Sequence, residues 1–330
     1  MLCIMKKLSA HIVLILLVFC SCTWADEKAP IRSTCIVPSM PGGGFDATCR
    51  LIAESSAAAQ LLPSRMLVHY LPGGVGVVAF NRYAYTTPDM SNTIIAVSTG
   101  SLVLLALGRF GEHANPNDVQ WIGAIGQDVG VMVVHPESAI HTLEQLAQSM
   151  RQNDPIVFGG SGSLGSQDWL KIALLAKEIQ VNPLQIRYVP QESGGEGMSA
   201  LLGKHIDVFS GDLSNVSSLV ESNKVRVLAI FSDETLAAPF DKLPTAKQQG
   251  FNLVRSSFRG VYAPGKIEKA SIDFWTAFIT RLSNTPEFKK RQAQYGFLPL
   301  PLTGVAFKQY VMEQYKETQE LVKWALSYEQ

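Results

Sequence analysis

The sequence predicts an α/β protein of two domains, each a βα sandwich with a mostly parallel sheet, with a ligand cleft between the domains. The chain has 330 residues and is 47% hydrophobic, which is enough to bury two cores. Short apolar segments typical of buried strands alternate with segments of helical periodicity up to about residue 260. Two of the predicted strands run into glycine-rich loops that open helices, at residues 36–52 and 156–178.

The first glycine-rich loop follows a short apolar strand at residues 36–37, and the helix after it is expected to run to about Leu62. Three successive glycines allow positive φ and a close approach of backbone to ligand. The free N–H groups and the dipole of the following helix favour an anion at its start. Phe45 is expected either to fill the core or to turn its ring edge to an anion, and Asp46 to cap the helix. The candidate ligand residues here are Gly43, Gly44, Phe45 and Asp46.

The second glycine-rich loop, at residues 159–166, follows the strand at 156–158 and leads into a helix at 167–178. We expect the two loops to face each other and hold one anionic ligand between them. The alternative is that both are ordinary tight turns between strand and helix. The candidate ligand residues of this loop are Ser161, Ser163 and Ser166.

Further walls of the site are expected where other parallel strands end, because ligands of open α/β sheets lie beyond the carboxyl ends of the strands. The strand at 93–97 ends in Ser98 and Thr99, and the strand at 206–209 is followed by Asp212. An aspartate does not bind a carboxylate directly, so Asp212 would orient amides, hydroxyls or water. Arg259 either binds an additional carboxylate of the ligand or forms a salt bridge at the domain interface.

The remaining elements define the predicted domains. Residues 119–134 are expected to form two strands or one long crossing strand, and Gly203 and Gly250 to end helices. Late helices at 268–282, 286–295 and 303–326 suggest that the chain returns to its first domain. We therefore assign residues 26–130 plus 252–330 to domain 1 and residues 131–251 to domain 2.

The N-terminus is expected to be an export signal at residues 1–25. A pair of lysines precedes the apolar run at 12–19, which is short for a membrane span, and cleavage after Ala25 fits a small residue at that position. A lipid anchor on Cys20 or Cys22 fits less well, because Phe19 lies next to the first and three positions before the second. The expected location is the periplasm, with the signal removed.

Only Cys35 and Cys49 remain after cleavage. In an oxidising compartment two cysteines are more often paired than free, so a Cys35–Cys49 disulfide is predicted. It would join the strand before the first glycine loop to the helix after it. The alternative is a pair of buried thiols.

The charge balance excludes some functions. The chain has 28 basic and 28 acidic residues, and it has no basic stripe that would indicate nucleic-acid binding. Removing the signal takes away two lysines and no acid, which leaves a net charge of −2, so local dipoles rather than the global field must capture an anion. The histidines show no metal-binding spacing. We therefore expect no metal, no cofactor and no catalytic residue.

Two enzyme classes were considered as alternatives, both acting on a small organic acid. Gly160, Gly162 and Gly165 match the dinucleotide fingerprint of an NAD-dependent oxidoreductase, but the next strand is followed by Pro190 and Gln191 rather than by an acid for the ribose. An exported hydrolase would need a nucleophile, yet the serines of this loop lie outside a Gly-x-Ser-x-Gly elbow.

An ordered set of short motifs resembles one receptor family. The motifs are PGGGFD at 41–46, LPGGVG at 71–76, GSQDW at 165–169, RVLA at 226–229, PT at 244–245 and RG at 259–260. Together they are similar to the extracytoplasmic solute receptors of the tripartite tricarboxylate transporters, over essentially the whole mature chain. Phe45, the motif at 165–169 and the cysteine pair resemble the tricarboxylate- or citrate-binding branch.

The resemblance implies a two-domain periplasmic binding protein, type II-like, that is a monomer and not an enzyme. Such a receptor binds a carboxylate between the domains and delivers it to the integral-membrane permease subunits of the transporter. In relatives, the loops corresponding to 42–46 and 161–166 hold one carboxylate through backbone amides, hydroxyls and ordered water. By the same match, residues 98–101 and Asp212 would line the cleft. Many relatives have Trp at the position of Arg259, so the choice among di- and tricarboxylates stays open.

Overall fold

The computed structural model describes residues 32–86 and 90–327 of the protein. The predicted signal peptide at residues 1–25 lies outside these ranges. Within them, no helix combines the length and the apolar character needed to cross a membrane.

The first lobe is built on a mixed sheet in the order β2-β1-β3-β9-β4, and the short strand β10 (Phe297–Leu298) pairs antiparallel with β4. β1 pairs in parallel with β2 and β3, whereas β9 runs antiparallel to both β3 and β4. Two hydrophobic clusters, one centred on Trp275 and one on Phe307, pack its helices against the strands. The strands are β1 (Thr34–Val37), β2 (Leu67–Tyr70), β3 (Thr93–Ser98), β4 (Gln120–Val134) and β9 (Ser256–Ala263). The helices are α1 (Gly44–Ala58), α2 (Val77–Asn81), α3 (Thr99–Ala106), α8 (Lys269–Ser283), α9 (Pro286–Gln294) and α10 (Gly304–Leu326).

The second lobe repeats the strand–helix alternation around its own core. Its strands β5 and β6 are parallel, and β5 is also parallel to β7, while β7 and β8 run antiparallel to β4. Two further hydrophobic clusters, around Phe158 and Phe209, fill this lobe. The strands are β5 (Val157–Ser161), β6 (Arg187–Gln191), β7 (Val208–Asp212) and β8 (Arg226–Ile230). The helices are α4 (Leu143–Arg151), α5 (Gln167–Glu178), α6 (Gly194–Leu202) and α7 (Leu213–Glu221).

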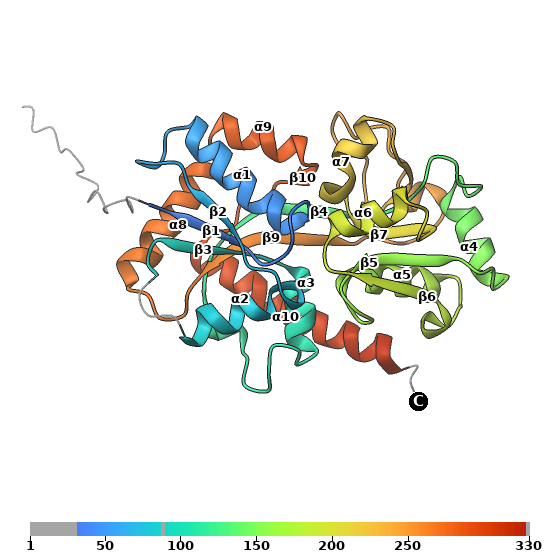
Figure 1. Ribbon diagram of the computed structural model, residues 1–330, viewed down its shortest axis with the longest axis horizontal. Helices are drawn as coiled ribbons and strands as arrows, with labels where there is room; N and C mark the ends of the chain where they lie inside the picture. Colours follow the sequence, from blue (N-terminus) through green and yellow to red (C-terminus); the bar gives the residue numbers. More distant parts are fainter. Residues whose placement is uncertain (1–31, 87–89, 328–330) are drawn as a thin grey trace, which may run out of the picture.

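Two elements connect the lobes. β4 is one long crossing strand, which pairs with β9 up to Val129 and with β7 from Gly130 onward (Figure 1). α8 and α9 pack on the first lobe as expected, but α10 continues under both lobes (Figure 1). Near its end, Val322 and Ala325 join the cluster of Trp169 in the second lobe. The α/β fold with two lobes is thus as predicted, while the domain boundaries assigned above remain a prediction.

Several element ends differ from expectation for local backbone reasons. α1 ends at Ala58 rather than near Leu62, because Gln60 has a φ of 52° that a helix does not tolerate. Gly203 keeps a φ of −79°, and the left-handed residue after α6 is Lys204 instead. The helix expected before Gly250 is only a short 3₁₀ turn, although Gly250 ends it in the left-handed conformation.

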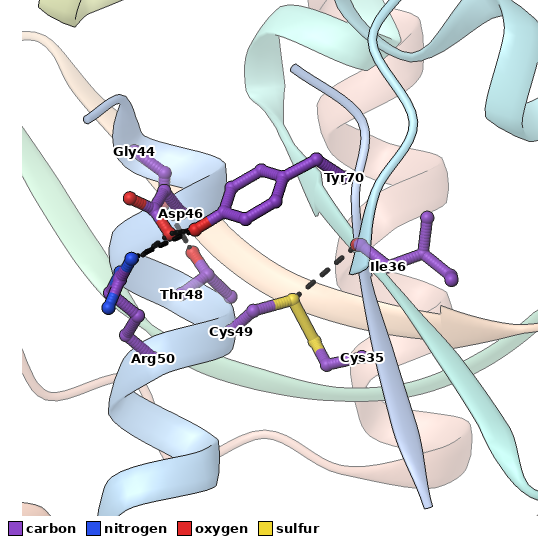
Figure 2. The surroundings of a disulfide bond; sticks show 8 residues. All are labelled: Cys35, Ile36, Gly44, Asp46, Thr48, Cys49, Arg50 and Tyr70. Atoms are coloured by element: carbon purple, nitrogen blue, oxygen red, sulfur yellow. Dashed lines mark hydrogen bonds and ion pairs between the residues drawn. A yellow bond between two sulfur atoms is a disulfide. The ribbon is translucent and has the colours of Figure 1, made fainter. Parts of the chain in front are cut away.

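The predicted disulfide is confirmed. Cys35 on β1 and Cys49 on α1 are bonded, with their Cα atoms 5.6 Å apart, so the strand and the helix on either side of the first glycine loop are tied together (Figure 2). On the same helix, the Asp46 carboxylate accepts hydrogen bonds from Arg50 and from the Tyr70 hydroxyl on β2, each at 2.8 Å (Figure 2). The helix start is therefore held from two sides.

Candidate ligand-binding site

The starts of five helices meet at one cavity between the two lobes. The cavity encloses roughly 530 Å³ of space between atoms, its open mouth included. The N-cap residues of all five helices line it: Gly43 (α1), Ser98 (α3), Ser166 (α5), Ser193 (α6) and Asp212 (α7). The first N–H groups of a helix have no partner within the helix, and its dipole is positive at this end. The cavity is therefore a place where positive potential from both lobes converges.

Three serines supply hydroxyls at these helix starts. The Oγ of Ser98, Ser166 and Ser193 each accepts a hydrogen bond from a backbone N–H of its own helix. Because a hydroxyl can accept and donate at once, Ser98 and Ser193 can still donate a proton into the cavity, while the Ser166 hydroxyl also interacts with the Tyr188 hydroxyl. These hydroxyls, with the free backbone N–H groups, form a set of donors suited to a carboxylate.

The lobes are in contact around the cavity. A Cβ added to Gly42 in the first lobe would lie 3.6 Å from the Cα of Gly195 in the second. A Cβ added to Gly162 would lie 3.7 Å from Val75 across the gap. The two predicted glycine loops thus share one cavity, and the first loop directly faces the start of α6.

The glycines of the two loops have different reasons to be glycine. Gly42, Gly162 and Gly165 have φ of 85°, 81° and 84°, in the left-handed region that glycine tolerates best. Gly44 is different, because it is the first residue of α1 and needs no positive φ. A Cβ there would lie 2.2–2.4 Å from three atoms of the Arg259 guanidinium, which packs face-on against the backbone.

Arg259 on β9 is buried, at 4% exposure, between two carboxylates. Its Nε and Nη2 donate to Asp128 Oδ2 at 2.9 and 2.6 Å, and Nη2 also donates to Asp212 Oδ2 at 2.7 Å. Because Asp212 belongs to the second lobe, this is an ion pair between the lobes. Burial alone would lower the pKa of Arg259, but Asp128 and Asp212 outweigh it and raise the pKa. Of the two roles expected for Arg259, the structure shows the salt bridge, and Arg259 also lines the cavity.

A second buried cation completes this cluster. Lys171 on α5 is fully buried, and its Nζ contacts Asp168 Oδ1 at 2.7 Å and Asp212 Oδ1 at 2.6 Å. Burial would lower the pKa of Lys171, but the two aspartates raise it. We call Asp128, Asp168, Lys171, Asp212 and Arg259 the buried charge cluster.

The buried charge cluster contains three carboxylates and two cations, and its excess carboxylate is Asp128. Burial raises the pKa of Asp128 to about 6, with Asp212 adding to the rise, while Arg259 and the Ser214 hydrogen bonds oppose it. Asp168 and Asp212, two of the three carboxylates that line the cavity, are each paired with buried cations, and Glu192 is the third. The repulsion of the two buried aspartates toward an anionic ligand is therefore largely cancelled.

The structure brings most of the sequence-predicted site residues to this cavity. Those that line it are Gly43, Gly44, Phe45, Ser98, Ser161, Ser166, Asp212 and Arg259. Asp46, Thr99 and Ser163 lie beside it but are not among the lining residues. Asp46 instead accepts a hydrogen bond from the N–H of Gly42 at 2.9 Å, which fixes the loop before the helix.

Sequence reasoning missed one wall of the cavity and several residues within recognised motifs, Val75 and Asp168 among them. The missed wall is the start of α6, where Ser193 and Gly194 line the cavity together with Asn215 of α7. Its signal in the sequence was the glycine pair after the strand β6, the same pattern as in the other two loops. Another missed motif residue is Gln167, which lines the cavity from the first position of α5.

No cluster of His, Cys, Asp or Glu in residues 32–86 and 90–327 could hold a metal ion. The site offers helix N-termini, hydroxyls and amides, and the charged side chains of the buried charge cluster are already paired with one another. It can bind and enclose an anion.

Comparisons with known proteins agree with this geometry. The chain is 23% identical over 298 residues to a UPF0065 protein from the gbd 5′ region of Cupriavidus necator, covering 90% of this chain and 87% of that protein. Among solved structures, it is similar to MatC from Rhodopseudomonas palustris with bound malate, at 22% identity and a TM-score of 0.76, covering 89% of this chain and 99% of that one. It is also similar to the periplasmic binding protein BugD, at 22% identity and a TM-score of 0.79, covering 89% and 97%.

A further solved structure, a Rhodopseudomonas palustris protein with adipate, aligns at 20% identity and a TM-score of 0.78, covering 91% of this chain and 97% of that one. The family model of the tripartite tricarboxylate transporter family receptor, TctC, matches residues 49–325. This family consists of solute-binding receptors, so the oxidoreductase and hydrolase alternatives are set aside. The chain belongs to the TctC family of tripartite tricarboxylate transporter receptors.

Proposed function

We propose that this protein is a periplasmic receptor that encloses a small organic acid between its lobes and delivers it to the membrane permease subunits of a tripartite tricarboxylate transporter. The observation that carries the proposal is the convergence of five helix N-caps on one cavity. One carboxylate of the ligand would lie at the starts of α1 and α5, bound by backbone N–H groups and the nearby serine hydroxyls. The signal at residues 1–25 would direct export, and the receptor would act as a monomer.

The resemblance of the sequence to the tricarboxylate-binding branch favours a tricarboxylate similar to citrate as the ligand. The structures with malate and adipate concern other proteins, and they support a small di- or tricarboxylate as the class to test. Arg259 would add positive charge beside the bound acid. Its hydrogen bonds to aspartates run from Nε and Nη2, which leaves Nη1 to donate to a ligand.

Calorimetry on the mature chain, residues 26–330, tests the proposal. We expect heat of binding and a rise in melting temperature with at least one of citrate, isocitrate, malate and adipate, and neither with NAD. Ligand at a hundred times its Kd stabilises a protein by about 2.7 kcal/mol, which a thermal shift resolves easily. Stabilisation by NAD and by none of the acids would contradict the proposal.

A matched pair of variants ties binding to the cavity. Gly43→Asp and Gly43→Asn both place a good N-cap residue on α1, so neither is expected to unfold the helix. A Cβ at this position has room, because its nearest neighbour would lie 3.6 Å away. Only the aspartate adds a negative charge to the cavity. We expect Gly43→Asp to bind the acid much more weakly than Gly43→Asn, and equal affinities would place the anion elsewhere.

A further inference from the structure

Gln167 presents an unused hydrogen-bond acceptor at the cavity. It is the first residue of α5 and is 8% exposed. Its Nε2 donates to Asp212 Oδ2 at 2.6 Å. The carboxylate of Asp212 also accepts from Lys171 and Arg259, so both of its oxygens face donors and the amide nitrogen of Gln167 must face it. The amide oxygen therefore points away from Asp212, and this buried Oε1 has no hydrogen-bond partner among the described residues.

The unpaired oxygen of Gln167 lies at the interface between the two lobes. A Cβ added to Gly100, on α3 of the first lobe, would lie 3.2 Å from Gln167 Oε1 and 3.3 Å from Ser98 Oγ. All three residues line the cavity. If the lobes separated, water would reach Oε1, and closure would remove that water. Closure without a replacement donor leaves a buried acceptor unpaired, which is unfavourable.

We propose that Gln167 Oε1 accepts a hydrogen bond from the ligand, and that the ligand carries a donor, a hydroxyl or an ammonium group, on the carbon next to a carboxylate. The inference rests on the proposed function, because it places the carboxylate at the start of the helix that Gln167 begins. A donor on the adjacent carbon would then lie beside the Gln167 side chain. Gln167 thereby selects a 2-hydroxy or 2-amino acid over the same acid without the donor.

Pairs of acids that differ by one donor test this in the wild-type mature chain. Malate is compared with succinate, and citrate with tricarballylate, by isothermal titration, and aspartate replaces the hydroxyl of malate by an ammonium. We expect the acid with the donor to bind about tenfold or more tightly than its partner, the usual consequence of leaving a buried acceptor unpaired. Tighter binding of malate identifies the donor as a hydroxyl, and tighter binding of aspartate identifies it as an ammonium.

Gln167→Met assigns the preference to this residue. Methionine has a similar length and neither the amide donor nor the amide oxygen. Losing the contact with Asp212 affects both acids of a pair alike, so the ratio of the two Kd values reports on Oε1 alone. We expect this ratio to fall to near one, and to stay at its wild-type value in the control Gln148→Met, whose side chain is exposed on α4.

The possible outcomes separate the inference from the proposed function. Equal affinities for malate, aspartate and succinate, and for citrate and tricarballylate, in the wild type would overturn the inference while leaving a carboxylate receptor. A preference for the acid with the donor that persists in Gln167→Met would also overturn the inference, because another residue would then accept the hydrogen bond from the donor. Binding of none of these acids, nor of isocitrate or adipate, would instead remove the proposed function. The wild-type comparison does not depend on whether Gln167→Met folds.

Discussion

Gly44→Ala tests whether position 44 must be glycine because Arg259 packs against it, rather than because of its backbone conformation. The added methyl carbon would lie 2.2 Å from the guanidinium carbon, whereas carbon atoms in contact lie at least about 3.5 Å apart. The guanidinium must therefore move by roughly 1.3 Å or α1 must shift by as much. Neither is easy, because the disulfide holds α1 to β1 and two aspartates hold Arg259.

The magnitude follows from the hydrogen bonds that such a shift would break. Arg259 donates to Asp128 and Asp212 at 2.6–2.9 Å, and a movement of this size across the plane of the guanidinium lengthens these contacts and takes the N–H groups out of line with the carboxylates. Breaking a buried ion pair typically lowers the free energy of unfolding by about 3–5 kcal/mol. We expect Gly44→Ala to approach this range, far above the effect of an ordinary substitution at a helix start.

Denaturant unfolding without ligand measures the effect, with Gly43→Ala as the control. At Gly43 the φ is −103° and the nearest neighbour of an added Cβ would lie 3.6 Å away, so this variant is expected to lose only about 1 kcal/mol through the weaker N-cap. In an Arg259→Ala background, Gly44→Ala should have little further effect, because the clashing group is gone. If Gly44→Ala unfolds at the same denaturant concentration as Gly43→Ala, the steric argument is wrong.

Three further predictions concern the buried charges and the disulfide. The pKa of Asp128 is raised from 3.8 in the unfolded chain to about 6 in the fold, so its contribution to stability falls as pH rises from about 4 to about 6. This amounts to roughly 3 kcal/mol, and Asp128→Asn should show a flatter pH dependence of unfolding over that range; an unchanged slope would contradict it. Lys171→Met leaves the buried Asp168 without its cation and removes one of the two cations of Asp212, so it should lower the free energy of unfolding by about 3–5 kcal/mol, whereas Lys204→Met, at an exposed ion pair, should change it by less than about 1 kcal/mol. Replacing Cys35 and Cys49 by serine should lower it by about 3 kcal/mol in the chain-entropy model, and a wild-type protein that is equally stable with and without reductant would refute this.

Local backbone patterns explain which elements were predicted well. The strand–glycine–helix units are visible because apolar runs, glycines and cap residues follow one another along the chain, and α5 has the expected limits of Gln167 and Glu178. Helix ends were predicted less well, because they depend on single residues in unusual conformations. Gln60 and Lys204 adopt positive φ in this fold although neither is glycine, and nothing in their local sequence indicates it.

The candidate site shows the same division. The serines and glycines of two loops were found from the sequence, since a helix start requires such residues at its cap. The third wall at α6 and the acceptor of Gln167 were not found. Their meaning depends on which helix start faces which across the cavity, and that is set by packing between segments far apart in the chain.

The sequence by itself determined the alternation of strands and helices, the disulfide partners and the family, because these depend on residues close in the chain or on an ordered set of motifs. Only the tertiary structure decided that Gly44 must be small because of Arg259, that Asp128, Lys171 and Arg259 share one buried cluster, and that five helix starts meet at one cavity. The physical reason is that burial, pairing and repulsion of charges depend on distances across the fold, and residues such as Asp128 and Arg259 lie 131 positions apart in the chain.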